Sequence, residues 1–463
     1  MSYARSLFIF RRDLRLDDNT ALIRAMKVSR QVITAFIFDP RQCEPHDYFS
    51  PNAFEFLQQS LADLQRRLVN KGGRLNLYYG LAEDVVPDLV TEHKIEAVFW
   101  NRDYTPFSSR RDAALRQRLG ECGCVCEELH DALLSPPGSV YKDAGGPYTV
   151  FTPFYRKALS QPAPLPVASF PEGMFWGGVL QSRHSFREGQ LGKSRNPQLA
   201  FSGGRDQAIK ILGSLLRLKN YSSCRDIPAL AATSGLSAHL KFGTLSVREA
   251  HAAISRVLGG DHPLIRQLYW RDFFTHIAWH FPHVFTGAFY PEYDAIHWEN
   301  REDFFLAWCE GRTGFPLVDA GMRELNTTGF MHNRCRMVTA SFLVKDLHID
   351  WRKGERYFAS RLLDYDPALN NGNWQWAAST GCDHQPYFRI FNPWLQQTRF
   401  DPEAKYIKKW LPELGNLAPV DIHDPLRLSR SGYCPLLVDH ALAKQWAQSV
   451  FREISRRGTA IGC

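Results

Sequence analysis

The chain has 463 residues, of which 44% are hydrophobic and 22% are charged, and its formal net charge is +8. This length exceeds one ordinary hydrophobic core, so we expect two domains. No apolar run approaches the roughly 18–20 residues of a membrane-spanning helix, which argues against a membrane protein. The N-terminal segment lacks the apolar core of a signal peptide, so we expect a soluble protein of the cytoplasm.

Aromatic residues are the unusual part of the composition. They make up 13% of the chain and include 12 tryptophans. Aromatic side chains in this number favour flat ligands, nucleic-acid bases or electron transfer. The positive net charge permits a polyanionic partner without requiring one.

The first 130 residues predict an α/β domain. Short apolar runs typical of buried parallel strands alternate there with amphipathic segments. The runs lie at 6–10, 32–38, 74–80, 96–100 and 124–129. With right-handed crossovers they form a doubly wound, Rossmann-like parallel sheet. The segment after the first run reads RRDLRLDDN instead of G-x-G-x-x-G, so a dinucleotide bound in the usual Rossmann manner is not expected.

Three cysteines cluster near the end of this domain. Cys122, Cys124 and Cys126 are spaced by two, so on a strand all three would point to one face. No cysteine pair in the chain has the two-residue gap typical of zinc or redox sites. We therefore expect buried, reduced thiols and predict no metal site.

The composition changes twice along the chain. Residues 131–199 are rich in Pro, Gly and Ser, which predicts a surface connector after an α/β domain at 1–130. From 200 to 463 almost every segment has helical periodicity, which predicts an all-α domain.

Several blocks of the sequence resemble the DNA photolyase and cryptochrome family. They include FRRDLRLDDN, TSGLSAHLKFG, QLYWRDFF, GFMHNRCRM and LLDYDPALNNGNWQWAASTG. The blocks occur in the family's order over nearly the whole chain, and the microbial class I photolyases of cyclobutane pyrimidine dimers are the most similar. The resemblance implies an antenna chromophore on the α/β domain, FAD in the helical domain and UV-damaged DNA as substrate. It also implies a monomer.

The residues themselves give weaker signals for the flavin site. The TSGLS segment places hydroxyls and a glycine ahead of a helix, which suits a nest of backbone N–H groups for a pyrophosphate. His332 and Arg336 are four apart, so on a helix they would share one face, with Asn333 and Met337 on the next. Alone, Arg336 and Asp364 would be interpreted as a structural ion pair.

The resemblance adds roles for these residues. Arg336 and Asp364 would bracket the isoalloxazine, Asp366 would face the sugar, and Asn370 would sit beside flavin N5. A neutral amide there favours the anionic reduced flavin. The remaining residues implied to bind FAD are Tyr221, Thr233, Ser234, Gly235, Leu236, Ser237 and Arg271.

The tryptophans divide into two groups by the same resemblance. Trp374, Trp351 and Trp298 would carry an electron from the surface to photoexcited oxidised flavin. Trp376 and Trp270 would form opposite walls of a pocket for a flipped-out lesion. The other residues implied to contact the lesion are Gln267, Asn333 and Met337. The candidates for the phosphates that flank it are Arg225, Arg271, Arg334 and, as an addition, Arg389.

Gln267 departs from the family pattern. Class I photolyases of cyclobutane dimers carry a glutamate there that hydrogen-bonds the lesion bases, whereas an amide supplies neither a proton nor a negative charge. Photolyases of (6-4) products also have glutamine at this place, but they pair it with two adjacent histidines, and here Asn333 follows His332. We expect cyclobutane dimer repair. Repair of a (6-4) product or its Dewar isomer, or a blue-light photoreceptor, remain alternatives; the short segment beyond the family homology does not favour signalling.

The sequence specifies the antenna chromophore least well. Folate-using relatives carry a glutamate where Phe107 and Ser108 stand here. LKFG, in contrast, resembles deazaflavin-binding members, in which the residues matching Lys241 and Asp103 contact the chromophore. We expect 8-hydroxydeazaflavin, with FMN, methenyltetrahydrofolate or no antenna as alternatives.

Overall fold

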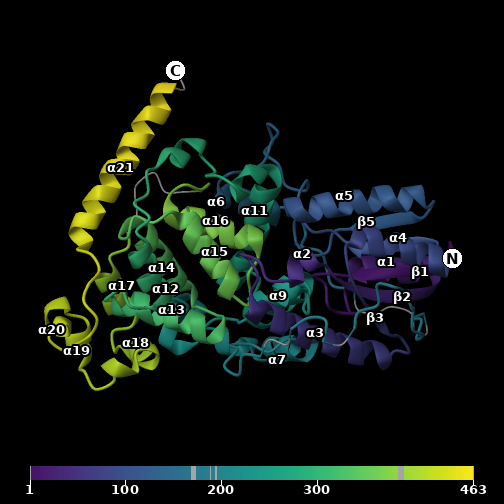
Figure 1. Ribbon diagram of the computed structural model, residues 1–463, viewed down its shortest axis with the longest axis horizontal. Helices are drawn as coiled ribbons and strands as arrows, with labels where there is room; N and C mark the ends of the chain where they lie inside the picture. The colour runs from purple at the N-terminus through teal and green to yellow at the C-terminus, as the bar shows by residue number, and fades with distance from the viewer. Residues whose placement is uncertain (1, 168–173, 188, 193–194, 384–389, 462–463) are drawn as a thin grey trace. The chain divides into compact units, whose positions relative to one another are not determined.

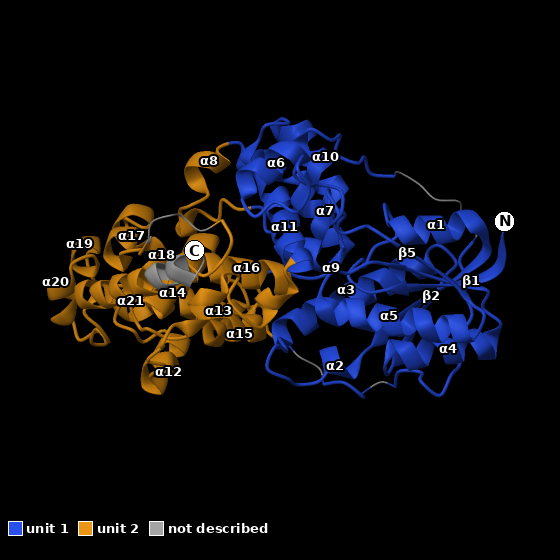
Figure 2. Cartoon of the chain, turned by 90° about the horizontal axis from the view of Figure 1, so that it is seen from above, with its two compact units in different colours: residues 1–195, 201–219, 234–280 blue, residues 196–200, 220–233, 281–463 orange. Residues whose placement is uncertain are grey.

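The structure, a computed structural model, describes residues 2–167, 174–187, 189–192, 195–383 and 390–461, with the side chains of 455–461 left out. The chain folds into two compact units. Unit 1 comprises residues 1–195, 201–219 and 234–280, and unit 2 comprises 196–200, 220–233 and 281–463 (Figure 2). The predicted domain boundaries at 130 and 200 stay a prediction.

Unit 1 contains the predicted parallel sheet. Its strands are β1 Tyr3–Phe10, β2 Ser29–Phe38, β3 Leu75–Tyr79, β4 Ala97–Asn101 and β5 Val125–Leu129. They pair in the order β3-β2-β1-β4-β5, and every pairing is parallel. The chain moves outward from β1 to β3 on one side and then returns to β4 on the other. The order therefore reverses between β1 and β4, which is where open α/β sheets bind their ligands.

Helices cover both faces of this sheet (Figure 1). On one face, α4 Ala82–His93 and α5 Pro106–Glu121 pack their apolar residues against Leu7, Ile9 and Trp100. On the other, α1 Thr20–Val28 contacts β1, β2 and β4, and α3 Pro51–Val69 contacts β3. The side chains of a strand alternate between the faces, so its continuous apolar run fills two cores. The predicted fold class is confirmed for this unit.

The cysteine prediction was wrong in part. Cys122 is exposed beyond the end of α5, Cys124 is buried immediately before β5, and only Cys126 lies on the strand, half-buried. The cause is that β5 begins one residue later than the apolar run. All described cysteines are free thiols.

The other regular elements of unit 1 are helices. Its further helices are α2 Pro40–Cys43, α6 Phe151–Leu159, α7 Arg205–Gly213, η1 Leu215–Leu218, α9 Ser237–Phe242, α10 Val247–Leu258 and α11 Pro263–His280. Helix α6 lies within the predicted connector, and the segment around it has little regular structure.

Unit 2 is helical, as predicted. Its principal helices are α8 Tyr221–Cys224, α12 Glu302–Glu310, α13 Pro316–Thr328, α14 Asn333–Lys345, α15 Trp351–Arg361, α16 Pro367–Ala378, α17 Pro393–Phe400, α18 Lys405–Trp410, α19 Pro419–Ile422, α20 Pro425–Ser429 and α21 His440–Ile461. Short 3-10 turns are η2 Pro228–Leu230, η3 Pro282–Phe285, η4 Pro291–Ala295 and η5 Pro412–Leu414. Their apolar sides enclose a main core that contains Trp308, Phe342, Trp351 and Trp374, and a smaller cluster contains Tyr293 and Phe451.

Local capping fixes where the central helices begin. The Asp366 carboxylate accepts from the backbone N–H groups of Ala368 and Leu369, and Pro367 opens α16. His332 similarly caps α14, its Nδ1 accepting from the N–H of Arg334 at 3.2 Å. The expectation that His332 and Arg336 share a helix face was therefore wrong, because His332 is extended backbone outside the helix.

Among the described residues, no helix is both long and apolar enough to cross a membrane.

Candidate active site

An ion pair joins α14 to the loop before α16. The Arg336 Nη2 donates to both carboxylate oxygens of Asp364, at 3.1 and 3.0 Å, and its Nε donates to the carbonyl oxygen of Met331 at 2.8 Å. The Asp364 side chain is only 3% exposed, whereas that of Arg336 is 25% exposed. The guanidinium is thus fixed by its carboxylate and still has an accessible edge for a ligand.

Asn370 is held in one orientation on α16. Its Nδ2 donates to the carbonyl oxygen of Glu355 at 3.0 Å and to the Glu355 carboxylate at 2.8 Å. Both amide hydrogens have partners in α15, so the side-chain oxygen is the group left to meet a ligand. Sequence reasoning assigned Asn370 and missed Glu355, although Glu355 lies within HIDWRKGERYF, a stretch that also resembles the family.

The three tryptophans of the predicted electron chain lie on neighbouring elements. Trp374 of α16 and Trp351, the first residue of α15, are both 2% exposed. Trp298 precedes α12, is half-buried and packs against the same core. The Trp298 ring also lies 6.3 Å from that of Phe451 of α21. Exposure therefore increases from Trp374 to Trp298, as a chain leading outward requires.

A glycine sets the close approach of α15 to α16. A Cβ on Gly354 would meet the Trp374 ring at 2.3 Å and a Leu343 methyl at 2.4 Å. We expect Gly354→Ala to destabilise the protein by about 1–3 kcal/mol, because the Trp374 ring has to move in a close-packed core. Urea unfolding measures this. Gly213→Ala, at the end of α7 where no atom lies within 4 Å of a Cβ, is the control.

The predicted phosphate-binding segment is divided between the units. Thr233 falls in unit 2 with Tyr221, which is buried, and residues 234–237 fall in unit 1. Ser234 Oγ accepts from the N–H of Leu236 at 3.3 Å. Gly235 has φ +72°, and a Cβ there would lie 2.8 Å from the Phe201 ring. Both the backbone angle and this contact explain glycine here.

Helix α11 of unit 1 carries the three residues predicted at QLYWRDFF. Trp270 stacks on Phe151 of α6, with ring centroids 3.6 Å apart and planes 6° apart. Gln267, three residues earlier, is half-buried. Arg271 is 8% exposed, and its guanidinium donates to the carbonyl oxygens of Ala132 and Leu240. The predicted role of Arg271 at a DNA phosphate does not suit this buried position.

In unit 2, both candidate phosphate ligands contact aromatic rings. Arg334 pairs with Asp226 at 2.9 Å, and its guanidinium lies 4.1 Å from the centre of the Phe400 ring. Arg225 lies 5.2 Å from the centre of the Tyr221 ring.

The remaining predicted lesion residues also have a place in unit 2. The Asn333 amide donates to Met337 Sδ at 3.6 Å, which orients both side chains on α14. Trp376 is half-buried, with its ring 6.5 Å from that of Phe391. Arg389 lies outside the described residues.

Asp103 and Lys241 come together at the carboxyl edge of the sheet. Asp103 follows β4 and accepts from Arg12 at 2.9 Å, from the N–H of Tyr104 at 2.8 Å and from Ser108 Oγ at 3.0 Å. Burial raises the pKa of Asp103, but the nearby cations Arg12 and Lys241 outweigh it and hold that pKa well below its usual range. This charged cluster lies where the strand order reverses, and Arg12, in the block after β1, was not assigned from sequence.

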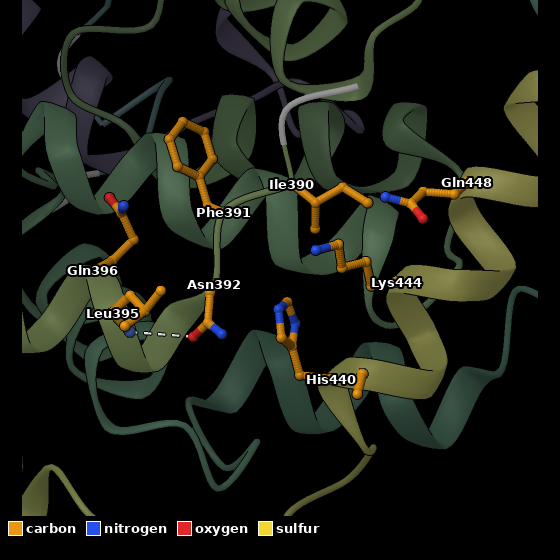
Figure 3. A pocket seen from close by; sticks show the side chains of 9 residues that line it. Ile390, Phe391, Asn392, Leu395, Gln396, His440, Lys444 and Gln448 are labelled. Carbon is orange, nitrogen blue, oxygen red and sulfur yellow. Dashed lines mark hydrogen bonds between the residues drawn. The ribbon is translucent and has the colours of Figure 1, made fainter. Parts of the chain in front are cut away.

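A pocket of about 590 Å³ lies elsewhere in unit 2 (Figure 3). Its lining consists of Ile390, Phe391, Asn392, Leu395, Gln396, His440, Ala441, Lys444 and Gln448. None of the residues predicted from sequence lines it.

Two family models match the chain. The one described as DNA photolyase matches residues 6–172, and the one described as FAD binding domain of DNA photolyase matches residues 264–453. A deoxyribodipyrimidine photo-lyase of Synechococcus sp. is 38% identical over 97% of this chain and 96% of its own length. The chain belongs to the DNA photolyase family.

Solved photolyase-family structures have the same architecture. An archaeal photolyase from Sulfolobus tokodaii, described with two FAD molecules, is 43% identical, with a TM-score of 0.87 over 97% of this chain and all of its own. A Synechocystis sp. cryptochrome is 29% identical, with a TM-score of 0.89 over 97% of this chain and 99% of its own. The second similarity shows that this fold also occurs in a protein named as a cryptochrome.

The polar groups of unit 2 are chemically suited to the isoalloxazine ring of FAD. An isoalloxazine presents N–H donors and carbonyl acceptors. Unit 2 offers a matching acceptor in the Asn370 side-chain oxygen and a cation in Arg336, which Asp364 fixes in place. The match of residues 264–453 to the FAD binding domain of DNA photolyase identifies FAD as the cofactor.

Proposed function

We propose that the protein is a light-driven lyase that splits cyclobutane pyrimidine dimers in DNA. The observation that carries the proposal is the orientation of Asn370, which lies on α16 with Trp374 and Trp376. Its amide donates to the carbonyl oxygen and to the carboxylate of Glu355 on α15. The name of the Synechococcus relative, which matches nearly the whole chain, supports the same activity.

When bound and reduced, FAD supplies the electron that opens the cyclobutane ring after excitation by light. The protein side chains hold the flavin and stabilise its reduced form. The Asn370 oxygen would accept a hydrogen bond at N5, and Arg336, held by Asp364, would balance negative charge on the reduced ring. Asp366, two residues from Asp364, would face the sugar. In unit 1, residues 234–237 and Arg271 would contact the phosphates, and in unit 2 Tyr221 and Thr233 would do so.

The lesion is recognised by aromatic and polar groups. Trp270 and Trp376 stack on the flipped bases, because a dimer stacks poorly in the duplex and costs only a few kcal/mol to extrude. Gln267, Asn333 and Met337 contact the base edges. Arg225 and Arg334 bind the flanking phosphates, which makes affinity fall with salt.

A repair assay tests the proposal. Anaerobically reduced protein is illuminated with blue light on oligonucleotides that bear a cyclobutane dimer, a (6-4) product or its Dewar isomer, with dark controls. We expect light-dependent repair of the cyclobutane dimer, and Gln267→Glu to keep it. Repair of another lesion alone would make Gln267 a determinant of lesion choice, and no repair with FAD bound would favour a photoreceptor.

We further propose that 8-hydroxydeazaflavin is the antenna and that Asp103 and Lys241 hold it at the reversal of strand order. The ionised Asp103 and the cation of Lys241 suit a polar tricyclic ring. A flavin such as FMN is the second candidate, since the S. tokodaii photolyase is described with two FAD molecules. Reconstitution with each compound, followed by an action spectrum of repair, distinguishes them. A new band matching the bound compound is expected, and Lys241→Met should remove it.

The proposal also takes the enzyme to be a monomer of the cytoplasm. Sedimentation equilibrium and cell fractionation measure these two properties.

A further inference from the structure

Three residues on two consecutive turns of α11 bind one short segment of unit 1. Arg271 donates to the carbonyl oxygen of Ala132, Asp272 Oδ2 accepts from the N–H of Ser135 at 2.8 Å, and His276 Nε2 lies 2.9 Å from the carbonyl oxygen of Ser135. Residues 132–135 are otherwise irregular. The contacts at 271, 272 and 276 therefore fix how this segment and α11 lie against each other.

Among these three side chains, Asp272 is the one whose burial costs the most folding free energy. It is 0% exposed, and its Oδ1 is buried without a hydrogen-bond partner among the described residues. A buried carboxylate oxygen without a donor is destabilising, and an apolar or amide side chain would avoid burying the charge. A group kept at such a cost is a candidate for a functional role.

The same helix carries the groups assigned to the lesion. Trp270 and Gln267 precede Asp272 by two and five residues, and Trp270 stacks on Phe151 of α6. A rotation or shift of α11 against residues 132–135 therefore moves the lesion-contacting side chains.

We propose that Asp272 is a positioning residue for lesion binding, and that the proton on its carboxyl group sets how firmly α11 is held against residues 132–135. The inference rests on the proposed function. Because burial raises the pKa of this carboxyl, the closed packing of α11 on residues 132–135 favours the protonated form, and ionisation loosens that packing although the carboxylate is the better acceptor for the Ser135 N–H.

The surroundings leave Asp272 as the group that titrates near neutral pH. Burial raises the pKa of Asp272 to about 7, against the opposing charge of Arg271. Burial lowers the pKa of His276 to about 4 and also lowers those of His280 and His130. Burial raises the pKa of Tyr104, and the charges of Asp103 and Asp272 raise it further, so its phenol stays neutral. Among these titratable groups, Asp272 is therefore the one whose charge changes most between pH 6 and 8.

The test measures binding in the dark. FAD-loaded protein is titrated with an oligonucleotide bearing one cyclobutane dimer and with its undamaged counterpart, from pH 6 to 8.5 at fixed salt. The ratio of the two dissociation constants cancels the general effect of pH on DNA binding. We expect the preference for damaged DNA to fall about three- to tenfold as pH increases through 7, because ionisation of the buried carboxyl weakens the packing of α11 on residues 132–135.

Asp272→Asn distinguishes a role of the titrating carboxyl group in lesion binding from a purely structural role of this side chain. The amide oxygen keeps the bond from Ser135, so the variant should fold and prefer damaged DNA, but with a ratio that no longer depends on pH. Asp319→Asn is the matched control: Asp319 is also 0% exposed, but it lies on α13 and accepts from Thr313 and Tyr433. It should leave the pH dependence unchanged.

Each outcome decides the inference. A pH-independent ratio in the unmodified protein, or the same pH dependence in Asp272→Asn, would overturn the role of Asp272. No preference for damaged DNA at any pH would instead overturn the proposed function.

Discussion

Replacing Trp374 with phenylalanine is expected to abolish light-driven reduction of bound oxidised flavin and to leave dimer repair by chemically reduced protein intact. Trp374 is the buried, inner member of the tryptophan chain, and phenylalanine is far harder to oxidise. A barrier increase of only about 3 kcal/mol already slows the electron transfer about 100-fold. Illumination with a thiol reductant, followed by the flavin absorbance, measures the rate.

The neighbouring Trp308 provides a matched control. Its ring is 6.2 Å from that of Trp374, it is 0% exposed, and its Nε1 donates to the carbonyl oxygen of Thr339. Trp308→Phe loses this bond and leaves a cavity, so it should cost stability without slowing photoreduction. Equal photoreduction in Trp374→Phe and the unmodified protein would exclude Trp374 from the chain.

The sequence predicts the sheet of unit 1 well because most residues of β1 to β4 are buried, on both faces of the sheet. Continuous apolar runs of five to seven residues, separated by amphipathic helices, leave few other arrangements. The same pattern cannot locate a strand end within one residue, which is why Cys122 and Cys124 were misplaced. His332 failed for a related reason: a spacing of four predicts a shared helix face only after the cap has been located.

The flavin residues were predicted only through the family resemblance. Periodicity gives Arg336 and Asp364 no more than an ion pair, and nothing in NNGNWQW shows that Asn370 donates both hydrogens to Glu355. Asp272 is a clearer case. It reads as an ordinary charged residue after Arg271, and only burial and the partnerless Oδ1 single it out. Long-range contacts of this kind depend on tertiary packing, which local sequence does not encode.

Breaking the pair between Arg336 and Asp364 is expected to remove FAD and to destabilise the protein strongly. Arg336→Met leaves the Asp364 carboxylate, 3% exposed, without its cation. An uncompensated buried charge of this kind costs about 3–5 kcal/mol. The flavin also loses the cation that balances its reduced ring. Urea unfolding of flavin-free protein and the ratio of flavin to protein absorbance measure the two effects separately.

A double-mutant cycle tells the ion pair apart from the ligand contact. Asp364→Asn is expected to cost less than Arg336→Met, because the Arg336 side chain is 25% exposed and water still solvates its charge. Combining the two changes removes the buried charge, so stability should recover relative to Arg336→Met alone. Flavin binding should not recover, since the guanidinium is still missing. Recovery of both would reduce Arg336 to a structural ion pair, which is what its sequence spacing alone suggests.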